Sequence, residues 1–258
     1  MASRATTHAK PVSRACTLLK LAPLFIIFSG APALADETDQ HDCAQQDRAY
    51  VALLACSRLL TAPDLDPVKR VQYVMLRGRA SLTLFDFGEA VEDFTEVLKA
   101  EPDNLIALAG RAEALSQHGS HANAAEDWTR IVALRPDDIA AGLQAGLSHN
   151  AAGTYEKAVA AFGEVVKRDA ANTEAHVGLA KAYEKLGQRD KADESLAAAL
   201  KINPASASAL MTQGEIAEGR GDAKLAIESY LGAVKANGML LKPRQALQRL
   251  GVETPTPR

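Results

Sequence analysis

The hydrophobic positions of the chain recur with a period of 34 residues. The segment GEAVEDFTEVLKAEPDN (88–104) and the segment EKAVAAFGEVVKRDAAN (156–172) lie 68 residues apart and place their alanine, aromatic and valine residues at the same spacing. The chain can be written in five lines of 34 residues that begin at Val71, Leu105, Ile139, Thr173 and Ala207. A fixed period of this length predicts an array of similar units, each packed on the next.

Several columns of this arrangement hold one kind of residue. Position 20 is alanine in every line: Ala90, Ala124, Ala158, Ala192 and Ala226. Position 8 is always small: Gly78, Ala112, Gly146, Ala180 and Gly214. Position 24 is bulky: Phe94, Trp128, Phe162, Leu196 and Tyr230. Position 15 is glycine except at Phe85, and position 32 is proline in three lines. Agreement among so many columns indicates a true structural repeat.

Each line predicts two helices. Apolar residues recur at steps of three and four over positions 1–14 and 18–31. Glycine at position 15 supplies the left-handed conformation that ends the first helix. Proline at position 32 ends the second, because proline cannot donate a hydrogen bond within a helix. Such a hairpin cannot bury its apolar face alone, so neighbouring hairpins must stack on one another.

The period, the alanine column and the terminal proline resemble the tetratricopeptide repeat (TPR) family of helix–turn–helix units. The resemblance implies an all-α, right-handed superhelical solenoid with five repeats, at 71–104, 105–138, 139–172, 173–206 and 207–240. Residues 36–70 are expected to form an N-terminal capping half-repeat. Residues 241–258 are expected to form a C-terminal capping helix and a short tail.

The first 35 residues have a different pattern. The first twenty carry four basic and no acidic side chains, and the apolar stretch LAPLFIIFSGAPALA follows, ending in Ala33, Leu34 and Ala35. This order is typical of a secretory signal peptide, here cleaved after Ala35. A membrane anchor is the alternative, but the stretch is shorter than the roughly 20 residues that a spanning helix needs. We therefore expect a mature protein that is periplasmic or secreted, without membrane insertion.

Charge and composition narrow the possible partners. The chain is 47% hydrophobic but only 5% aromatic, and its formal net charge of −3 becomes more negative once the basic leader is removed. No basic tract remains that could hold nucleic acid or anionic lipid. Protein or peptide partners in the cell envelope fit this composition better.

Two cysteines remain after the leader, Cys43 and Cys56. An even pair in an exported chain predicts a disulfide, which would tie the first segment to its helix and contribute about 3 kcal/mol. Two buried thiols, or a metal site that includes His41, are the alternatives.

No residue pattern indicates catalysis, a metal or a cofactor. His149 and His176 fall at packing positions of the repeat, and His118 and His121 fall in a turn without a carboxylate or cysteine at ligand spacing. The sequence contains no glycine-rich phosphate loop and no nucleophile elbow. We therefore expect a protein that is not an enzyme and needs no cofactor.

In the TPR family the first helix of each repeat lines a concave groove, with positions 2, 5, 9, 12 and 13 facing inward. Three of these columns hold the following residues: Met75, Ala109, Leu143, Val177 and Met211 at position 5; Arg79, Glu113, Leu147, Lys181 and Glu215 at position 9; Leu82, Ser116, Asn150, Glu184 and Glu218 at position 12. The resemblance thus implies an apolar ribbon with mixed charge that becomes acidic toward the C-terminal repeats. Alternatively, the position 5 residues only help neighbouring repeats to pack.

The groove columns also bear on the kind of partner. The basic and asparagine residues with which some TPR proteins clamp a terminal carboxylate are missing from position 5. The surface suits an extended or helical segment with alternate apolar anchors and some basic residues. We expect a non-catalytic scaffold or adaptor that binds a protein or peptide. A protein that binds a small molecule or glycan of the envelope is the alternative, although the groove columns hold few aromatic residues.

Overall fold

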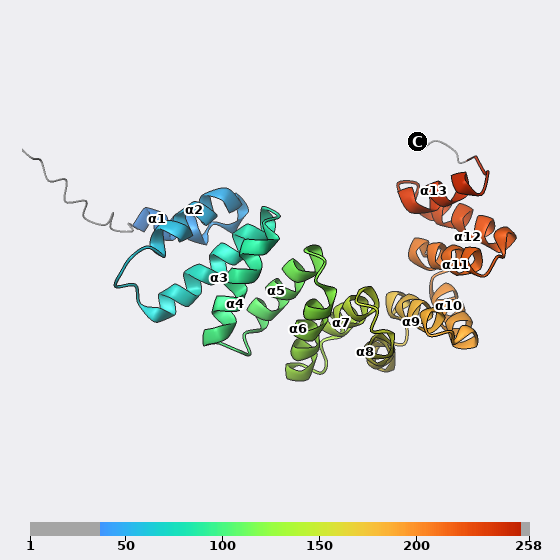
Figure 1. Cartoon of the computed structure of the whole chain (residues 1–258), viewed down its shortest axis with the longest axis horizontal. Helices are drawn as coiled ribbons and strands as arrows, with labels where there is room; N and C mark the ends of the chain where they lie inside the picture. The colour runs from blue at the N-terminus through green and yellow to red at the C-terminus, as the bar shows by residue number, and fades with distance from the viewer. Residues whose placement is uncertain (1–36, 254–258) are drawn as a thin grey trace, which may run out of the picture. The chain divides into compact units, whose positions relative to one another are not determined.

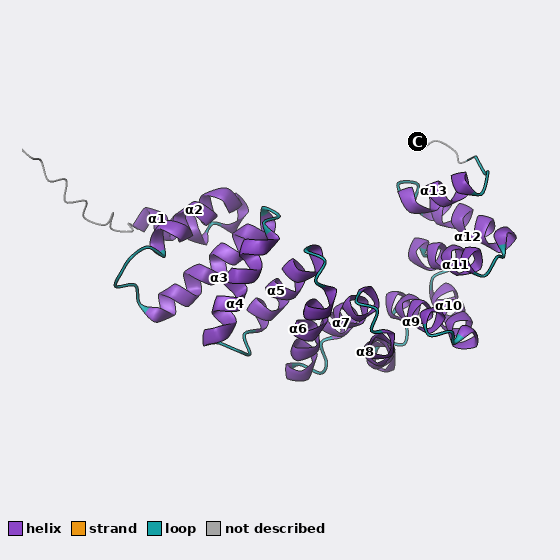
Figure 2. Cartoon of the chain, in the orientation of Figure 1, coloured by secondary structure: helices purple, strands orange, loops and turns teal. Residues whose placement is uncertain are grey.

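The computed structural model describes residues 37–253 and is all-α over that range (Figures 1 and 2). The predicted signal peptide and its cleavage site lie outside the described residues. The helices are α1 Glu37–Ala44, the short 3-10 helix η1 Gln46–Arg48, α2 Ala49–Leu59, α3 Pro67–Thr83, α4 Phe87–Ala100, α5 Leu105–Gln117, α6 His121–Leu134, α7 Ile139–Ala151, α8 Tyr155–Arg168, α9 Thr173–Lys185, α10 Arg189–Ile202, α11 Ala207–Gly219, α12 Ala223–Ala236 and α13 Leu241–Arg249. Within residues 37–253 no helix is both long and apolar enough to cross a bilayer.

The predicted fold class is confirmed: the chain is a solenoid of helix–turn–helix units. Each helix from α3 to α12 packs on the helices before and after it. Several pairs of successive first helices also touch: α3 with α5, α7 with α9 and α9 with α11. Four of the five first helices, α5, α7, α9 and α11, begin at position 1 of their lines. The arrangement therefore follows the 34-residue period seen in the sequence.

Polar residues at the helix boundaries explain where the first helices begin. Asn104, Asp138, Asn172 and Ser206 each accept a hydrogen bond from a backbone N–H in the first turn of the helix that follows. All four stand at position 34, the last residue of a line. Such a cap contributes about 1 kcal/mol, so one column of small polar residues fixes the same start in four repeats.

The turn inside each repeat depends on position 15. Gly119, Gly153, Gly187 and Gly221 all have positive φ, between 72° and 84°. Phe85 adopts the same conformation with φ 62° although it carries a side chain, and the residue is 78% exposed. Left-handed backbone is costly for residues other than glycine, so the first repeat keeps the turn at the expense of local strain.

The bulky residue at position 24 fills the core where two helices cross. Phe162 of α8 is fully buried between Gly146 of α7 and Gly178 of α9. A Cβ atom added to either glycine would lie 2.6 Å or 2.3 Å from the ring. Gly78 and Gly110 flank Phe94 in the same way. The small residues therefore make room for the ring as well as for the backbone.

Both ends of the solenoid are covered. A disulfide joins Cys43 of α1 to Cys56 of α2, as the sequence predicts, and both residues are fully buried. At the other end α13 lies against α12, where Ala246 and Leu247 are buried together with Tyr230. These two elements shield apolar faces that have no further repeat to cover them.

Candidate partner-binding groove

A cavity of about 780 Å³ lies along the first helices α7, α9 and α11. Six of the predicted groove residues line it: Leu147, Asn150, Val177, Lys181, Glu184 and Glu215. A second cavity of about 500 Å³ follows toward the C-terminus, and Met211, Glu215 and Glu218 line it together with residues of α12 and α13. The structure thus brings the groove residues of the last three repeats onto one continuous set of helices.

The first two repeats contribute nothing to the lining of these two cavities. Met75, Leu82 and Ala109 pack against the core around Phe94, and Leu143 packs in the same way beside Phe162. Arg79 and Glu113 are exposed. The candidate site is therefore centred on α7, α9 and α11 and not spread evenly over all five repeats.

The position 5 column is less accessible than an apolar ribbon requires. Val177 is only 3% exposed and belongs to a buried cluster with Leu196 and Ile216. The structure places this side chain between neighbouring helices, which is the packing role that the sequence left open. Leu147 at position 9 is the most exposed of the apolar groove residues, with 42% of its surface accessible.

The acidic groove residues near the C-terminus are already paired. Arg220 Nε lies 3.1 Å from Glu184 Oε1, and the same guanidinium contacts Asp193 at 2.9 Å. The hydrogen bond from Arg220 lowers the pKa of Glu184. Glu218 accepts a 2.7 Å hydrogen bond from the Tyr230 hydroxyl, which lowers the pKa of Glu218, while burial raises the pKa of Tyr230. The groove is therefore less acidic than its sequence columns suggest.

The remaining charges of the cavity alternate in sign. Lys181 Nζ lies 3.9 Å from Glu215 Oε2, and Glu174 accepts a 3.0 Å hydrogen bond from the Ser208 hydroxyl. Lys185 is exposed on the same helix as Lys181. A ligand would meet an apolar strip with charges of both signs beside it.

Two buried oxygens at the cavity have no hydrogen-bond partner among the described protein atoms. One is Oδ1 of Asn150, whose Nδ2 donates a 2.9 Å hydrogen bond to the Gly178 carbonyl, and the other is Oγ1 of Thr212. Both oxygens are enclosed by protein atoms, so they are not among the groups that a bound chain would contact.

Sequence reasoning identified positions 5, 9 and 12 but missed other lining residues. Glu174 and Ser208 stand at position 2, and Ala151, Lys185 and Gly219 stand at position 13. Those two columns are groove positions in the family, so reading them line by line would have found these residues. Arg220 could not have been found in this way, because it follows the groove column and acts by neutralising Glu184.

The contacts of His149 and His176 fit the packing positions that the repeat assigns to them. His149 is buried, with Nδ1 2.9 Å from Thr154 Oγ1 and Nε2 3.3 Å from Thr129 Oγ1. His176 is half-buried, and its Nε2 lies 3.1 Å from the Ala170 carbonyl oxygen. No group of three potential ligands in residues 37–253 is arranged to hold a metal ion.

Comparisons with known proteins agree with this architecture. Two family models described as tetratricopeptide repeat match residues 75–139 and 149–216. The search of curated proteins finds no match.

Solved structures share the fold at low sequence identity. A structure of MamA is 24% identical with a TM-score of 0.53, and the match covers 62% of this chain and 94% of that one. MamA from residue 41 onward of Desulfovibrio magneticus RS-1 is 20% identical with a TM-score of 0.56, covering 65% and 95%. A thermophilic TPR protein of Thermus thermophilus is 21% identical with a TM-score of 0.55, covering 70% and 98%. At these identities the likeness is evidence for the fold alone.

Proposed function

Because the chain belongs to the tetratricopeptide repeat family, we propose that it is a non-catalytic scaffold that binds a segment of a partner protein along α7, α9 and α11. The observation that carries the proposal is the 780 Å³ cavity, which six of the sequence-predicted groove residues line. Helix faces of this kind bind extended or helical segments through spaced apolar anchors.

The contacts of the cavity define the kind of segment. Leu147 provides an exposed apolar contact. Lys181 and Glu215 form an ion pair with each other, and either side chain can instead pair with an opposite charge on a partner. Since Glu184 is neutralised by Arg220, a strongly basic segment has no special advantage. We expect a segment with apolar anchors and one or two charges of either sign.

The same proposal includes export. The basic leader, the short apolar stretch and the small residues up to Ala35 support cleavage and release outside the cytoplasm. A partner would then be a protein of the cell envelope or its surroundings. N-terminal sequencing of the mature protein from a fractionated culture tests this part, because retention of residues 1–35 would contradict it.

Capture from envelope extract tests the binding site. The wild-type mature chain is compared with Leu147→Glu/Lys181→Glu, which alters the cavity without touching the fully buried core. A charge-matched control, Val68→Glu/Arg79→Glu, makes the same net change of charge at two exposed residues of α3. We expect a specific protein to bind the wild type and the control but not the groove variant. Equal binding to all three would show that the partner docks elsewhere.

A further inference from the structure

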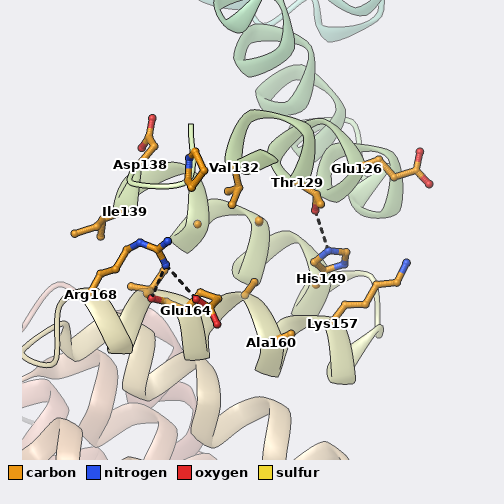
Figure 3. A pocket seen from close by; sticks show the side chains of 15 residues that line it. Glu126, Thr129, Val132, Asp138, Ile139, His149, Lys157, Ala160, Glu164 and Arg168 are labelled. Carbon is orange, nitrogen blue, oxygen red and sulfur yellow. Dashed lines mark hydrogen bonds and ion pairs between the residues drawn. The ribbon is translucent and has the colours of Figure 1, made fainter. Parts of the chain in front are cut away.

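A separate hollow of about 510 Å³ lies on a different face of α7, between α6 and α8 (Figure 3). Its floor consists of Ile139, Gly142 and Ala145 of α7. Its walls carry the apolar residues Val132 of α6 and Ala160, Ala161 and Val165 of α8. The groove residues of α7, such as Leu147 and Asn150, do not line it.

The hollow lies where the third repeat lacks an ion pair that the first two repeats contain. Arg77 and Asp93 form this pair in the first repeat, with Nε 2.9 Å from Oδ2, and Arg111 and Asp127 form it in the second, at 2.8 Å. These residues stand at positions 7 and 23 of the repeat. In the third repeat the same two positions are Ala145 and Ala161.

The second repeat shows how the arginine of the ion pair fills the corresponding space. The Arg111 guanidinium reaches from α5 to Asp127 of α6 and also lies 3.3 Å from Thr95 Oγ1 of α4. The corresponding hollow there, lined by Leu98, Leu108 and Arg111 among others, has about 280 Å³. One repeat later Gly142 replaces the leucine and Ala145 replaces the arginine, and the volume is about 510 Å³. In the fourth repeat the two positions are His176 and Leu179, which are large again.

Polar groups bound the hollow at both ends (Figure 3). At one end His149 bridges from α7 to Thr129 of α6. Thr129 Oγ1 donates its own proton to the Ala125 carbonyl at 2.7 Å, so it accepts a hydrogen bond from Nε2–H of His149. At the other end Arg168 pairs with Glu164 at 3.1 Å. A hollow bounded in this way fits a compact molecule better than a chain that must continue past its ends.

Around the rim four carboxylates outnumber two basic side chains, which gives a net charge of −2. Glu126 and Lys157 project beyond His149 from opposite walls (Figure 3). At the far end Arg168 is balanced by Glu164 and by Asp137, 3.6 Å away, while Asp138 contributes one further negative charge. A ligand with a net negative charge therefore gains nothing here, and its apolar body would provide most of the binding free energy.

We propose that this hollow is a binding site for a small, uncharged lipophilic molecule. Its volume lies within the range of roughly 300–1,000 Å³ typical of small-molecule sites. The ligand would rest on Gly142 and Ala145, between Val132 and Val165, with the His149–Thr129 hydrogen bond at its polar end. This site is separate from the partner-binding groove, so neither proposal depends on the other.

Fluorescence titration with N-phenyl-1-naphthylamine tests the site. This neutral dye of two linked aromatic groups brightens in apolar surroundings. With the mature chain we expect saturable binding with a Kd on the order of 10 µM. Absence of saturable binding would overturn the proposal.

Two variants locate the binding. Ala145→Arg/Ala161→Asp rebuilds in the third repeat the pair that the first two already accommodate, and it should weaken dye binding at least tenfold. Ala145→Leu places in the hollow the residue that the fourth repeat has at this position, and it should weaken dye binding several-fold. This second variant keeps the test valid if Ala145→Arg/Ala161→Asp disturbs folding. Leu147→Glu in the groove is the control and should leave the Kd unchanged. Binding that survives both fillings would place the dye elsewhere and overturn the assignment.

A charged analogue tests the chemistry of the ligand. The anionic dye 8-anilinonaphthalene-1-sulfonate has a similar aromatic body, and we expect it to bind several-fold more weakly than the neutral dye. Equal or tighter binding that Ala145→Leu abolishes would show that the site accepts anions, which contradicts the uncharged class of ligand.

Discussion

The side-chain amide of Asn150 donates a 2.9 Å hydrogen bond to the backbone carbonyl of Gly178. This contact joins α7 to α9 across a repeat boundary, at the edge of the candidate groove. It couples the geometry of the groove to the packing of the core, because Gly178 is also one of the two glycines that enclose the Phe162 ring.

Removing this hydrogen bond is expected to destabilise the repeat interface. Asn150→Ala should lower the free energy of unfolding by about 1 kcal/mol, the usual contribution of one such bond. Leu147→Ala, one turn away at an exposed position, should change it by less than about 0.5 kcal/mol. Urea unfolding followed by circular dichroism measures both. An equal effect of the two variants would contradict a structural role for the amide.

Gly178→Ala is expected to be more harmful than the loss of that hydrogen bond. The added Cβ would lie 2.3 Å from the Phe162 ring, which is fully buried and cannot withdraw. Overpacking of this kind costs roughly 1–3 kcal/mol and sometimes more. Gly163→Ala, in the middle of α8, meets no atom within 4 Å and should stabilise the chain by about 0.5–1 kcal/mol. Thermal unfolding of the two variants should therefore shift in opposite directions.

Removing one member of the Arg77–Asp93 ion pair is expected to destabilise the chain more than removing both. Arg77→Ala leaves Asp93 buried, only 3% exposed, without its partner, and should cost about 3 kcal/mol. Arg77→Ala/Asp93→Ala copies the Ala145 and Ala161 of the third repeat and should recover much of that loss. Chemical denaturation measures the free energy of unfolding of both variants. A double variant no more stable than Arg77→Ala would contradict the expected recovery.

The fold was predictable because every repeat must solve the same packing problem. An alanine at position 20 and a bulky residue at position 24 recur in all five lines, and a polar residue stands at position 34 in the first four. The turn at Phe85 shows that the period outweighs local preference, since the backbone there adopts φ 62° without a glycine.

The candidate site was only partly predictable, because exposure depends on contacts between repeats. Val177 and Leu147 are both apolar and both stand in groove columns, yet one is 3% and the other 42% exposed. Likewise Ala145 looks like any small helix residue until it is compared with Arg111 at the same position. A hollow arises from side chains that are missing relative to a neighbouring repeat, and no single position reveals it.

Reducing the disulfide is expected to loosen the N-terminal end first. Closing a loop of this length contributes about 3 kcal/mol, and α1 and α2 cover the outer face of α3. Cys43→Ser/Cys56→Ser should therefore speed hydrogen exchange in α1 and α2 more than in α7 to α11. A thiol assay of the denatured mature protein should find no free thiol before reduction and two after it. Two free thiols before reduction would contradict the bridge.

The stability of the third repeat should depend on pH through His149. Burial lowers the pKa of this imidazole below its ordinary value of about 6.5, so the folded chain favours the neutral ring. The unfolded chain then binds more protons between pH 6.5 and the lower folded pKa, and the free energy of unfolding falls as the pH drops through that window. This contribution is fully present above pH 6.5.

His149→Gln isolates this effect from that of the other titrating groups. Glutamine can still form hydrogen bonds near Thr129 and Thr154 but does not take up a proton. We expect wild type to lose more stability than the variant between pH 7 and pH 5, measured by urea unfolding at each pH. An NMR titration of the His149 ring should give a midpoint below 6.5. Parallel losses in the two proteins, or a midpoint above 6.5, would show that the buried imidazole does not favour its neutral form.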